Sequence, residues 1–354
     1  MEILIVLGGR FWLFYGDEKK GDSITLRMLK DLADMGYPLA KAEVYVNEYE
    51  YIAILDKGKF VVFKNPLVMG DFKWENVLWM FKGLLDKPFN YSEIISTEQL
   101  ASFYNLKFDV FRDNQKVVFK FSTISNSEIR FNIFGNKGIV GNLDIYVYNL
   151  FSTPMKVGIS GQFDSTRAYS EGELDIPENG YIPIGIFSEF NLYTENGQIL
   201  YYGGVHRWFG KTNLGFGMGE FYKPFGILRY INLKPEIIAK IFMGYGHMGF
   251  EVFGKFGIIS VKGFKGLWGL KKPYGGFNGY REVPMLNSLA DNFLVINVNI
   301  PIYKGIARTG VFFDVLFTKG YEPTSTYGLY INFKRLNAFV SKNRLFGISI
   351  GISQ

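Results

Sequence analysis

The last two thirds of the chain repeat one pattern, in which about ten residues of alternating polarity are followed by a turn. In residues 293–303, apolar side chains on one face of the expected strand alternate with Asn297 and Asn299 on the other. Residues 307–317 alternate in the same way, and residues 346–353 set Phe and Ile against Gly and Ser. Successive side chains of a strand point to opposite faces, so each segment is predicted to be a strand with one wholly apolar face.

Such strands fit either a soluble β-sandwich or a transmembrane β-barrel. A soluble sheet would present Lys, Glu and Thr to water, whereas the second face of residues 346–353 carries Gly and Ser. In a barrel, the apolar face contacts lipid and the other face lines the lumen. The repetition over residues 127–354 favours the barrel. At about 14 residues for each strand and its turn, it predicts an antiparallel transmembrane β-barrel of about sixteen strands.

The composition agrees with a mainly β protein and excludes several classes of function. Gly occurs 41 times, aromatic residues make up 18% of the chain and charged residues 20%, and no apolar run reaches the length of a membrane helix. There is no Cys and there are two His, His206 and His247, which excludes thiol catalysis and leaves little for a metal site. Lys and Arg are scattered, so the net charge of +6 does not indicate nucleic acid. We expect no enzymatic activity and no cofactor.

The first third carries the helical patterns of the chain. Residues 1–20 have a short apolar core after an acidic second residue, and we interpret them as a signal remnant or a mis-called start, with a first strand as the alternative. In residues 21–59, a helix is expected to begin at the N-cap Ser23 and to be followed by a strand pair. Residues 60–124 are expected to form strand, helix, helix, strand and strand, the first strand starting at Phe60.

This order of elements resembles the BamA/TamA superfamily, also called the bacterial surface antigen family. Residues 60–124 look like a POTRA module, residues 21–59 like part of an earlier module, and residues 127–354 like the barrel. The start of the barrel is similar to the first hairpin of the family at Gly141, Leu143, Asn149, Leu150 and Phe151. The resemblance implies a bacterial outer-membrane protein with a small α/β module in the periplasm.

A second resemblance concerns the sixth loop of the barrel. Its motif is similar to Phe277, Asn278, Gly279, Tyr280 and Arg281 in this chain. In the family, an Arg of this loop enters the lumen and pairs with acidic groups on strands thirteen and fourteen. Here Asn278 stands at the place of that Arg.

The acidic partners also differ from the family pattern. Asn297 stands at the place of the strand-thirteen Glu, whereas Asp314 matches the strand-fourteen Asp. A buried carboxylate needs a partner, so the resemblance implies that Arg281 or Arg308 serves Asp314. The two amides, Asn278 and Asn297, are expected to hydrogen-bond each other. The alternative is an ordinary glycine-containing loop, with Asp314 as a lumen-facing charge.

The first and last barrel strands are expected to meet at a seam. The first strand offers few lipid-facing side chains and the last is rich in glycine, so pairing is expected to be weak and to extend over only a few residues. The residues that define this seam are Glu128, Phe131, Ile133, Gly347, Ile350, Gly351 and Ile352.

The resemblance and the weak seam together suggest an outer-membrane β-barrel assembly or insertion factor, in which the open seam templates an incoming strand. The expected partners are the lipid bilayer, unfolded outer-membrane proteins as clients, and periplasmic proteins that bind the POTRA-like module. The alternative is a plugged or passive pore or transporter whose seam stays closed. A soluble β-sandwich binding protein is a third class, but it would need a larger core than these strand faces provide.

Overall fold

A computed structural model describes the chain except for residues 63–66, 70–71, 73, 83, 114–115, 125–126, 136–138, 151–152, 164–166, 180, 195–196, 276–278, 283–287 and 354. The chain forms two compact units. One consists of residues 1–72, 80–101 and 108–122, and the other of residues 73–79, 102–107 and 123–354. Within the described residues, no helix combines the length and the apolarity that a bilayer crossing requires.

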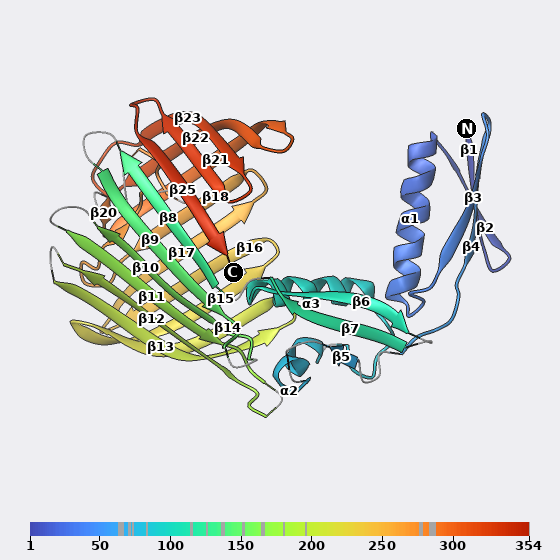
Figure 1. Cartoon of the computed structure of the whole chain (residues 1–354), viewed down its shortest axis with the longest axis horizontal. Coiled ribbons are helices and arrows are strands. Elements are labelled where there is room, and N and C mark those ends of the chain that lie inside the picture. The colour runs from blue at the N-terminus through green and yellow to red at the C-terminus, as the bar shows by residue number, and fades with distance from the viewer. Residues whose placement is uncertain are drawn as a thin grey trace. The chain divides into compact units, whose positions relative to one another are not determined.

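The larger unit contains a closed antiparallel barrel of sixteen strands, which confirms the predicted fold class and strand number (Figure 1). The first half of the barrel consists of β8 (Ser127–Gly135), β9 (Ile139–Tyr148), β10 (Lys156–Phe163), β11 (Ala168–Ile176), β12 (Gly185–Tyr193), β13 (Gln198–Phe209), β14 (Thr212–Phe221) and β15 (Lys223–Leu233). The second half consists of β16 (Glu236–Gly244), β17 (His247–Phe256), β18 (Ile259–Lys265), β21 (Asn292–Lys304), β22 (Arg308–Thr318), β23 (Thr324–Phe333), β24 (Leu336–Ser341) and β25 (Phe346–Ser353).

Short turns occur at both ends of the barrel, and its longest connection lies at one of them. We call the end at which β8 begins the proximal end and the opposite end the distal end. Turns of a few residues join β13 to β14, β15 to β16 and β21 to β22 at the proximal end. The long connection of residues 266–291 leaves the barrel at the distal end, between β18 and β21. This connection is the sixth loop of the sequence analysis.

The alternation of polarity places apolar side chains on the outside of the wall. On β25, Ile348, Ile350 and Ile352 are exposed, whereas Ser349 is buried on the lumen side. On β8, Phe131 and Ile133 are exposed in the same way. A continuous apolar outer face is what a lipid-facing wall requires, because every backbone group of a closed barrel is already paired.

Large inward-facing side chains fill much of the lumen. One apolar cluster includes Phe187, Phe242, Phe264 and Phe293, and a second includes Phe134, Phe312 and Phe339. The small residues of β25 leave room for the second cluster: a Cβ atom at Gly347 would lie 2.4 Å from the ring of Phe339. The ladder of Gly and Ser at the end of the chain therefore accommodates aromatic rings inside the barrel.

We expect Gly347→Ala to destabilise the barrel by about 1–3 kcal/mol, because the added methyl group meets a buried ring that Phe134 and Phe312 hold in place. Gly351→Ala on the same strand is the matched control, since the nearest atom to its Cβ lies at 3.7 Å. Denaturant unfolding in detergent, followed by tryptophan fluorescence, measures both variants. Equal midpoints for the two variants would contradict this account of the ladder.

The smaller unit begins with a four-stranded sheet. It consists of β1 (Glu2–Leu7), β2 (Arg10–Tyr15), β3 (Lys41–Val46) and β4 (Glu50–Asp56) in the order β2-β1-β4-β3. Helix α1 (Glu18–Asp34) packs Leu32 against the sheet residues Ile3, Ile5, Tyr51, Ala53 and Leu55. Strand β1 pairs in parallel with β4 and antiparallel with β2.

Residues 1–20 form β1, β2 and the start of α1, which agrees with the alternative of a first strand, and their short apolar core is the buried face of β1. One sequence interpretation, the start of the helix, is corrected here. The helix begins before Ser23: Asp17 is the N-cap, and its carboxylate accepts a hydrogen bond of 2.9 Å from the backbone N–H of Lys20. The earlier start adds a turn of charged residues that the apolar period does not reveal.

The segment of residues 60–124, of which residues 73–79, 102–107 and 123–124 belong to the larger unit, has the expected mixture of strands and helices. It includes β5 (Leu67–Met69), α2 (Trp74–Val77), the 3₁₀-helix η1 (Leu78–Phe81), α3 (Tyr91–Phe103), β6 (Leu106–Asp113) and β7 (Lys116–Thr123). Its three strands follow the order β5-β7-β6, with β5 parallel to β7. The strand expected at Phe60 lies later, at β5, whereas Val62 forms an isolated bridge with Pro88.

Candidate functional site

The sixth loop folds back into the lumen. Its short strands β19 (Lys272–Pro273) and β20 (Leu289–Ala290) pair with each other, and Gly275 bridges to Tyr280. Tyr280 is buried in the apolar cluster of the lumen. Phe277 and Asn278 lie outside the described residues, whereas the backbone of Gly279 passes so close to Tyr274 that a Cβ atom would lie 2.1 Å from its carbonyl oxygen.

Arg281 of this loop makes the central ion pair of the lumen. Its Nε and Nη2 atoms donate hydrogen bonds of 2.9 and 2.5 Å to the two carboxylate oxygens of Asp314 on β22. Its backbone N–H donates to the same carboxylate over 3.1 Å, and its Nη1 donates to Asn299 over 2.8 Å. The guanidinium also lies 3.9 Å from the ring centre of Phe312. Arg281 is therefore the partner of Asp314, a role that the sequence left open between Arg281 and Arg308.

Arg308 lies elsewhere. It begins β22 at the proximal rim of the barrel, is exposed, and pairs in register with Asn332 of β23. Asp314 is fully buried, so only a loop that enters the lumen brings a guanidinium to it. Arg308 begins β22 and Asp314 sits in the middle of it, so about half the length of the strand separates Arg308 from Asp314 and from the Arg281 side chain bound there.

Asn297 supports the fold of the loop from β21. Its Nδ2 donates a 2.8 Å hydrogen bond to the carbonyl oxygen of Gly279, and it lies opposite Asp314 in the register of β21 and β22. Counted from β8, these are the twelfth and thirteenth strands, not the thirteenth and fourteenth. The expected hydrogen bond between Asn297 and Asn278 falls partly outside the described residues.

The seam between β8 and β25 is longer than expected. The two strands pair along eight residue pairs, from Phe346 opposite Gly135 to Ser353 opposite Glu128. Within it, Ile350 lies opposite Phe131, Ile348 opposite Ile133, Gly347 opposite Phe134, Gly351 opposite Arg130 and Ile352 opposite Ile129. The expectation of a pairing over only a few residues is therefore wrong, because glycine removes side-chain packing but leaves the backbone ladder intact.

The shortest ladder of the barrel lies on the other side of β25. Strands β24 and β25 pair along five residue pairs, from Leu336 opposite Ile350 to Val340 opposite Phe346. The next shortest ladder joins β23 to β24 along six pairs, and the other ladders of the wall have seven to eleven. One further backbone hydrogen bond lies at each end of this joint, from the N–H of Ser341 to Leu345 and from the N–H of Gly351 to Arg335. The joint of β24 and β25 therefore has the shortest register of the wall among the described residues.

A buried network ties the segment that follows α3 to the barrel wall, within the larger unit. The hydroxyl of Tyr104 donates a 2.6 Å hydrogen bond to Asp175 on β11 and accepts one of 3.0 Å from the indole nitrogen of Trp208 on β13. Asp175 also accepts a 2.5 Å bond from Arg229 on β15, and His206 lies 3.4 Å from it. Burial and the charge of Asp175 raise the pKa of Tyr104 well above its usual value, so its hydroxyl remains a donor.

We expect Tyr104→Phe to reduce the free energy of unfolding by about 1–3 kcal/mol, because a buried carboxylate and a buried indole both lose a hydrogen-bond partner. Tyr181→Phe is the matched control, since Tyr181 is 79% exposed. The measurement is the midpoint of denaturant unfolding in detergent. A loss no larger than that of the control variant would show that the network adds nothing to stability.

A second charged network crosses the lumen and was not predicted. The ammonium of Lys240 on β16 contacts Glu189 on β12 over 2.5 Å and Glu251 on β17 over 3.6 Å. Lys272 of the sixth loop lies 2.7 Å from Glu251. Inward positions of these strands carry charges in the sequence, but only the closed wall brings strands far apart in the chain to face each other.

The two histidines take different places. His206 is buried beside Asp175 and contacts Asn213 over 2.7 Å, whereas His247 is exposed at the start of β17. Among the residues that the structure describes, no group of three His, Cys, Asp or Glu side chains is arranged to hold a metal ion.

Comparisons with known proteins bear on the fold. No family model and no curated protein sequence matches the chain. CdiB from Escherichia coli matches with a TM-score of 0.53 and 8% identity, over 95% of this chain and 85% of that one. CdiB from Acinetobacter baumannii matches with 0.49 and 12%, over 96% and 82%. BamA from Haemophilus ducreyi lacking POTRA domains 1-3 matches with 0.44 and 11%, over 96% and 94%.

The comparison with CdiB from Escherichia coli carries the argument, and at 8% identity it concerns the fold alone. The match extends over 95% of this chain, so it includes residues of the smaller unit as well as the barrel. Together with the sixteen-stranded wall and its apolar outer face, it confirms for the fold the resemblance seen in the sequence. The chain is a β-barrel protein of the bacterial outer-membrane type, with the fold found in CdiB.

Proposed function

We propose that the protein assembles or inserts other β-barrels by offering an edge of its own wall to an incoming strand. The observation that carries the proposal is the short ladder between β24 and β25. Opening a wall in lipid exposes unpaired N–H and C=O groups, and each such group costs several kcal/mol unless a new strand pairs with it. The joint of five residue pairs, with one further backbone hydrogen bond at each end, has the shortest register of the wall among the described residues, so its opening exposes a short edge, which can bind an extended chain by strand addition.

The last strand suits this role. Strand β25 remains joined to β8 along eight residue pairs when its other edge is released. Strand β24 has six residues, so the free edge of β25 would be longer than the partner it loses. The proposal differs from the sequence expectation in one respect, since the joint that parts is β24–β25 and the seam of β8 and β25 stays closed.

The smaller unit fits the same role, as a POTRA-like module in the periplasm. Its sheets have the orders β2-β1-β4-β3 and β5-β7-β6, so β6 and β3 are edge strands to which an unfolded client could add. No bond to the client is made or broken in this mechanism, so the proposed protein is no enzyme and needs no cofactor. Its partners are the bilayer, unfolded outer-membrane proteins and periplasmic proteins that bind the module.

The test is a folding assay in liposomes. Vesicles containing the purified protein receive a urea-unfolded outer-membrane barrel, and the heat-modifiable, folded form of this client is followed over time. We expect faster folding than in empty vesicles or in vesicles with an unrelated barrel of similar size. Folding at the rate of empty vesicles would refute the assembly proposal.

The second candidate is a plugged or passive pore, and it is favoured by the polar cavity inside the barrel, which has a volume of about 700 Å³. In that case the wall stays closed and the lumen conducts solute. Conductance across planar bilayers, measured on the same preparation, separates the two functions. A pore predicts steady conductance without any effect on the folding of the client.

A further inference from the structure

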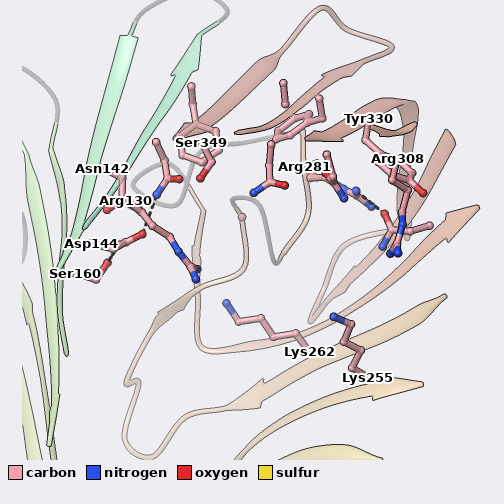
Figure 2. A pocket seen from close by; sticks show the side chains of 18 of the residues that line it. Arg130, Asn142, Asp144, Ser160, Lys255, Lys262, Arg281, Arg308, Tyr330 and Ser349 are labelled. Atoms are coloured by element: carbon pink, nitrogen blue, oxygen red, sulfur yellow. Dashed lines mark hydrogen bonds between the residues drawn. The ribbon is translucent and has the colours of Figure 1, made fainter. Parts of the chain in front are cut away.

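A cavity lies inside the barrel, beside the two joints of β25. Its volume is about 700 Å³, within the range of ligand pockets in proteins. It extends from the wall at β8 and β9 across to β17, β18 and β22. Figure 2 shows the ammonium groups of Lys255 and Lys262 and the guanidinium of Arg130 pointing toward its open centre.

A row of polar side chains crosses this cavity at one level of the strand register. Each member lies opposite the next on the neighbouring strand, and the row passes over both joints of β25. In order, its members are Asn142, Asn132, Ser349, Asn337 and Asn332. We call these five residues the amide row. All five line the cavity.

Two cations continue the amide row at the proximal rim. Asn332 lies opposite Arg308, and Arg308 lies opposite Lys304. Neither cation has a carboxylate of the described residues within 4.0 Å, and the same is true of Lys255 and Lys262. Both Lys304 and Arg308 are exposed to the cavity mouth and line it.

The carboxylates of the cavity are already engaged. Asp144 accepts a 2.9 Å hydrogen bond from Asn132 and another from the hydroxyl of Ser160. Glu171 accepts a 2.5 Å hydrogen bond from Tyr169. Hydrogen bonds from these neutral groups leave both carboxylates charged. The cavity lining holds four cations without a carboxylate of the described residues within 4.0 Å, which are Lys255, Lys262, Lys304 and Arg308, so its net charge is positive and an anionic ligand complements it.

The amide row favours a peptide over a simple anion. Asn142 is 7% exposed, and its Oδ1 has no hydrogen-bond partner among the described residues. A buried amide oxygen needs a donor, and a peptide backbone supplies an N–H at every residue except proline along the whole row, whereas a single phosphate ion reaches only one place in it. Amide side chains also donate to backbone carbonyl oxygens.

From this geometry we infer that the lumen of the barrel holds a binding site for an extended acidic peptide segment. The amide row hydrogen-bonds the backbone of the segment, and Lys304 and Arg308 pair with its carboxylates at the proximal end. The inference concerns binding alone. It holds whether the bound chain is a client of assembly or a polypeptide that crosses the membrane through the lumen, and it does not require the wall to open.

The test measures peptide binding to the full chain in detergent by fluorescence anisotropy. The probe is a fluorescein-labelled ten-residue peptide of alternating Glu and Ser, and the comparison peptide alternates Lys and Ser. We expect the acidic peptide to bind, the basic peptide not to bind, and Lys304→Glu/Arg308→Glu to weaken binding by about tenfold or more. The control Lys211→Glu/Lys234→Glu makes the same change of net charge in two other proximal turns, outside the cavity, and is expected to leave binding within about twofold.

A second pair of variants separates peptide from simple anion. Asn332→Ala/Asn337→Ala removes part of the amide row without removing charge, and it is expected to weaken peptide binding while the heat-modifiable fold is retained. Inorganic phosphate at equal ionic strength is expected not to displace the peptide beyond the effect of sodium chloride. Displacement by phosphate at low concentration, equal losses in the cavity and control variants, or no binding of the acidic peptide would each overturn the inference. The readout contains no client folding, so failure here and failure of the assembly proposal are distinguishable.

Discussion

Replacing Asp314 with alanine is expected to lower the free energy of unfolding by about 3–5 kcal/mol, because Arg281 would remain as an unpaired charge in the lumen. The side chain of Arg281 is 7% exposed, its guanidinium donates two hydrogen bonds to this carboxylate, and its backbone N–H donates a third. Breaking a buried ion pair from one side costs more than removing both partners, since the remaining charge keeps its desolvation penalty.

The double variant Arg281→Met/Asp314→Leu tests this reasoning. It removes both charges, and we expect it to recover at least half of the stability that Asp314→Ala loses. Arg308→Ala is the control for loss of an arginine, and its effect is expected to stay within about 0.5 kcal/mol because Arg308 is exposed. Unfolding in denaturant with tryptophan fluorescence gives all three values. A loss below about 1 kcal/mol for Asp314→Ala would show that the pair does not hold the loop in the lumen.

The barrel itself could be predicted from the sequence because its signal is local. A period of two in residues 293–303 and 346–353 shows in each segment which side chains share a face, and the closed wall repeats that segment sixteen times. The lipid-facing positions of β8 and β25 follow from the same alternation, and the structure exposes Phe131 and Ile350 as expected.

Features that depend on distant parts of the chain could not be predicted in this way. The partner of Asp314 depends on how far the sixth loop descends into the lumen, and no local pattern reports that depth. The network of Tyr104 joins residues separated by 71 and 104 positions. The length of the ladder between β8 and β25 was predicted wrongly for another reason. The prediction rested on the side chains of the two strands, whereas the hydrogen bonds of a ladder are made by the backbone.

Residues 1–20 show how a local signal can mislead. The apolar stretch in β1 is as short as a poor signal segment, and nothing within those residues indicates that β1 pairs with β4. The parallel pairing of β1 with β4 makes the stretch a buried central strand. Short apolar runs need their pairing partner before they can be assigned.

The second large effect is expected on client folding when a disulfide locks the wall at β25. A disulfide can lock either of its two joints, the one with β24 or the one with β8. Ser349 lies opposite Asn337 of β24 on one side and opposite Asn132 of β8 on the other. Directly opposed residues of antiparallel strands have Cα atoms about 4.5–5.5 Å apart, which suits a disulfide. Leu174 and Ser188, opposed on β11 and β12, provide a control lock far from β25 in the barrel order.

The most direct test of the account is the rate of client folding with each lock, oxidised and then reduced, in the same liposomes. We predict that oxidation of Ser349→Cys/Asn337→Cys abolishes client folding until the disulfide is reduced, whereas oxidation of Ser349→Cys/Asn132→Cys and of Leu174→Cys/Ser188→Cys leaves the rate equal to that of the same variant when reduced. Loss of activity with the lock to β8 alone would place the opening at the closing seam and contradict the argument from ladder length. Client folding at the unlocked rate with the β24–β25 joint fully crosslinked would show that the wall does not part there, and the central claim would fail.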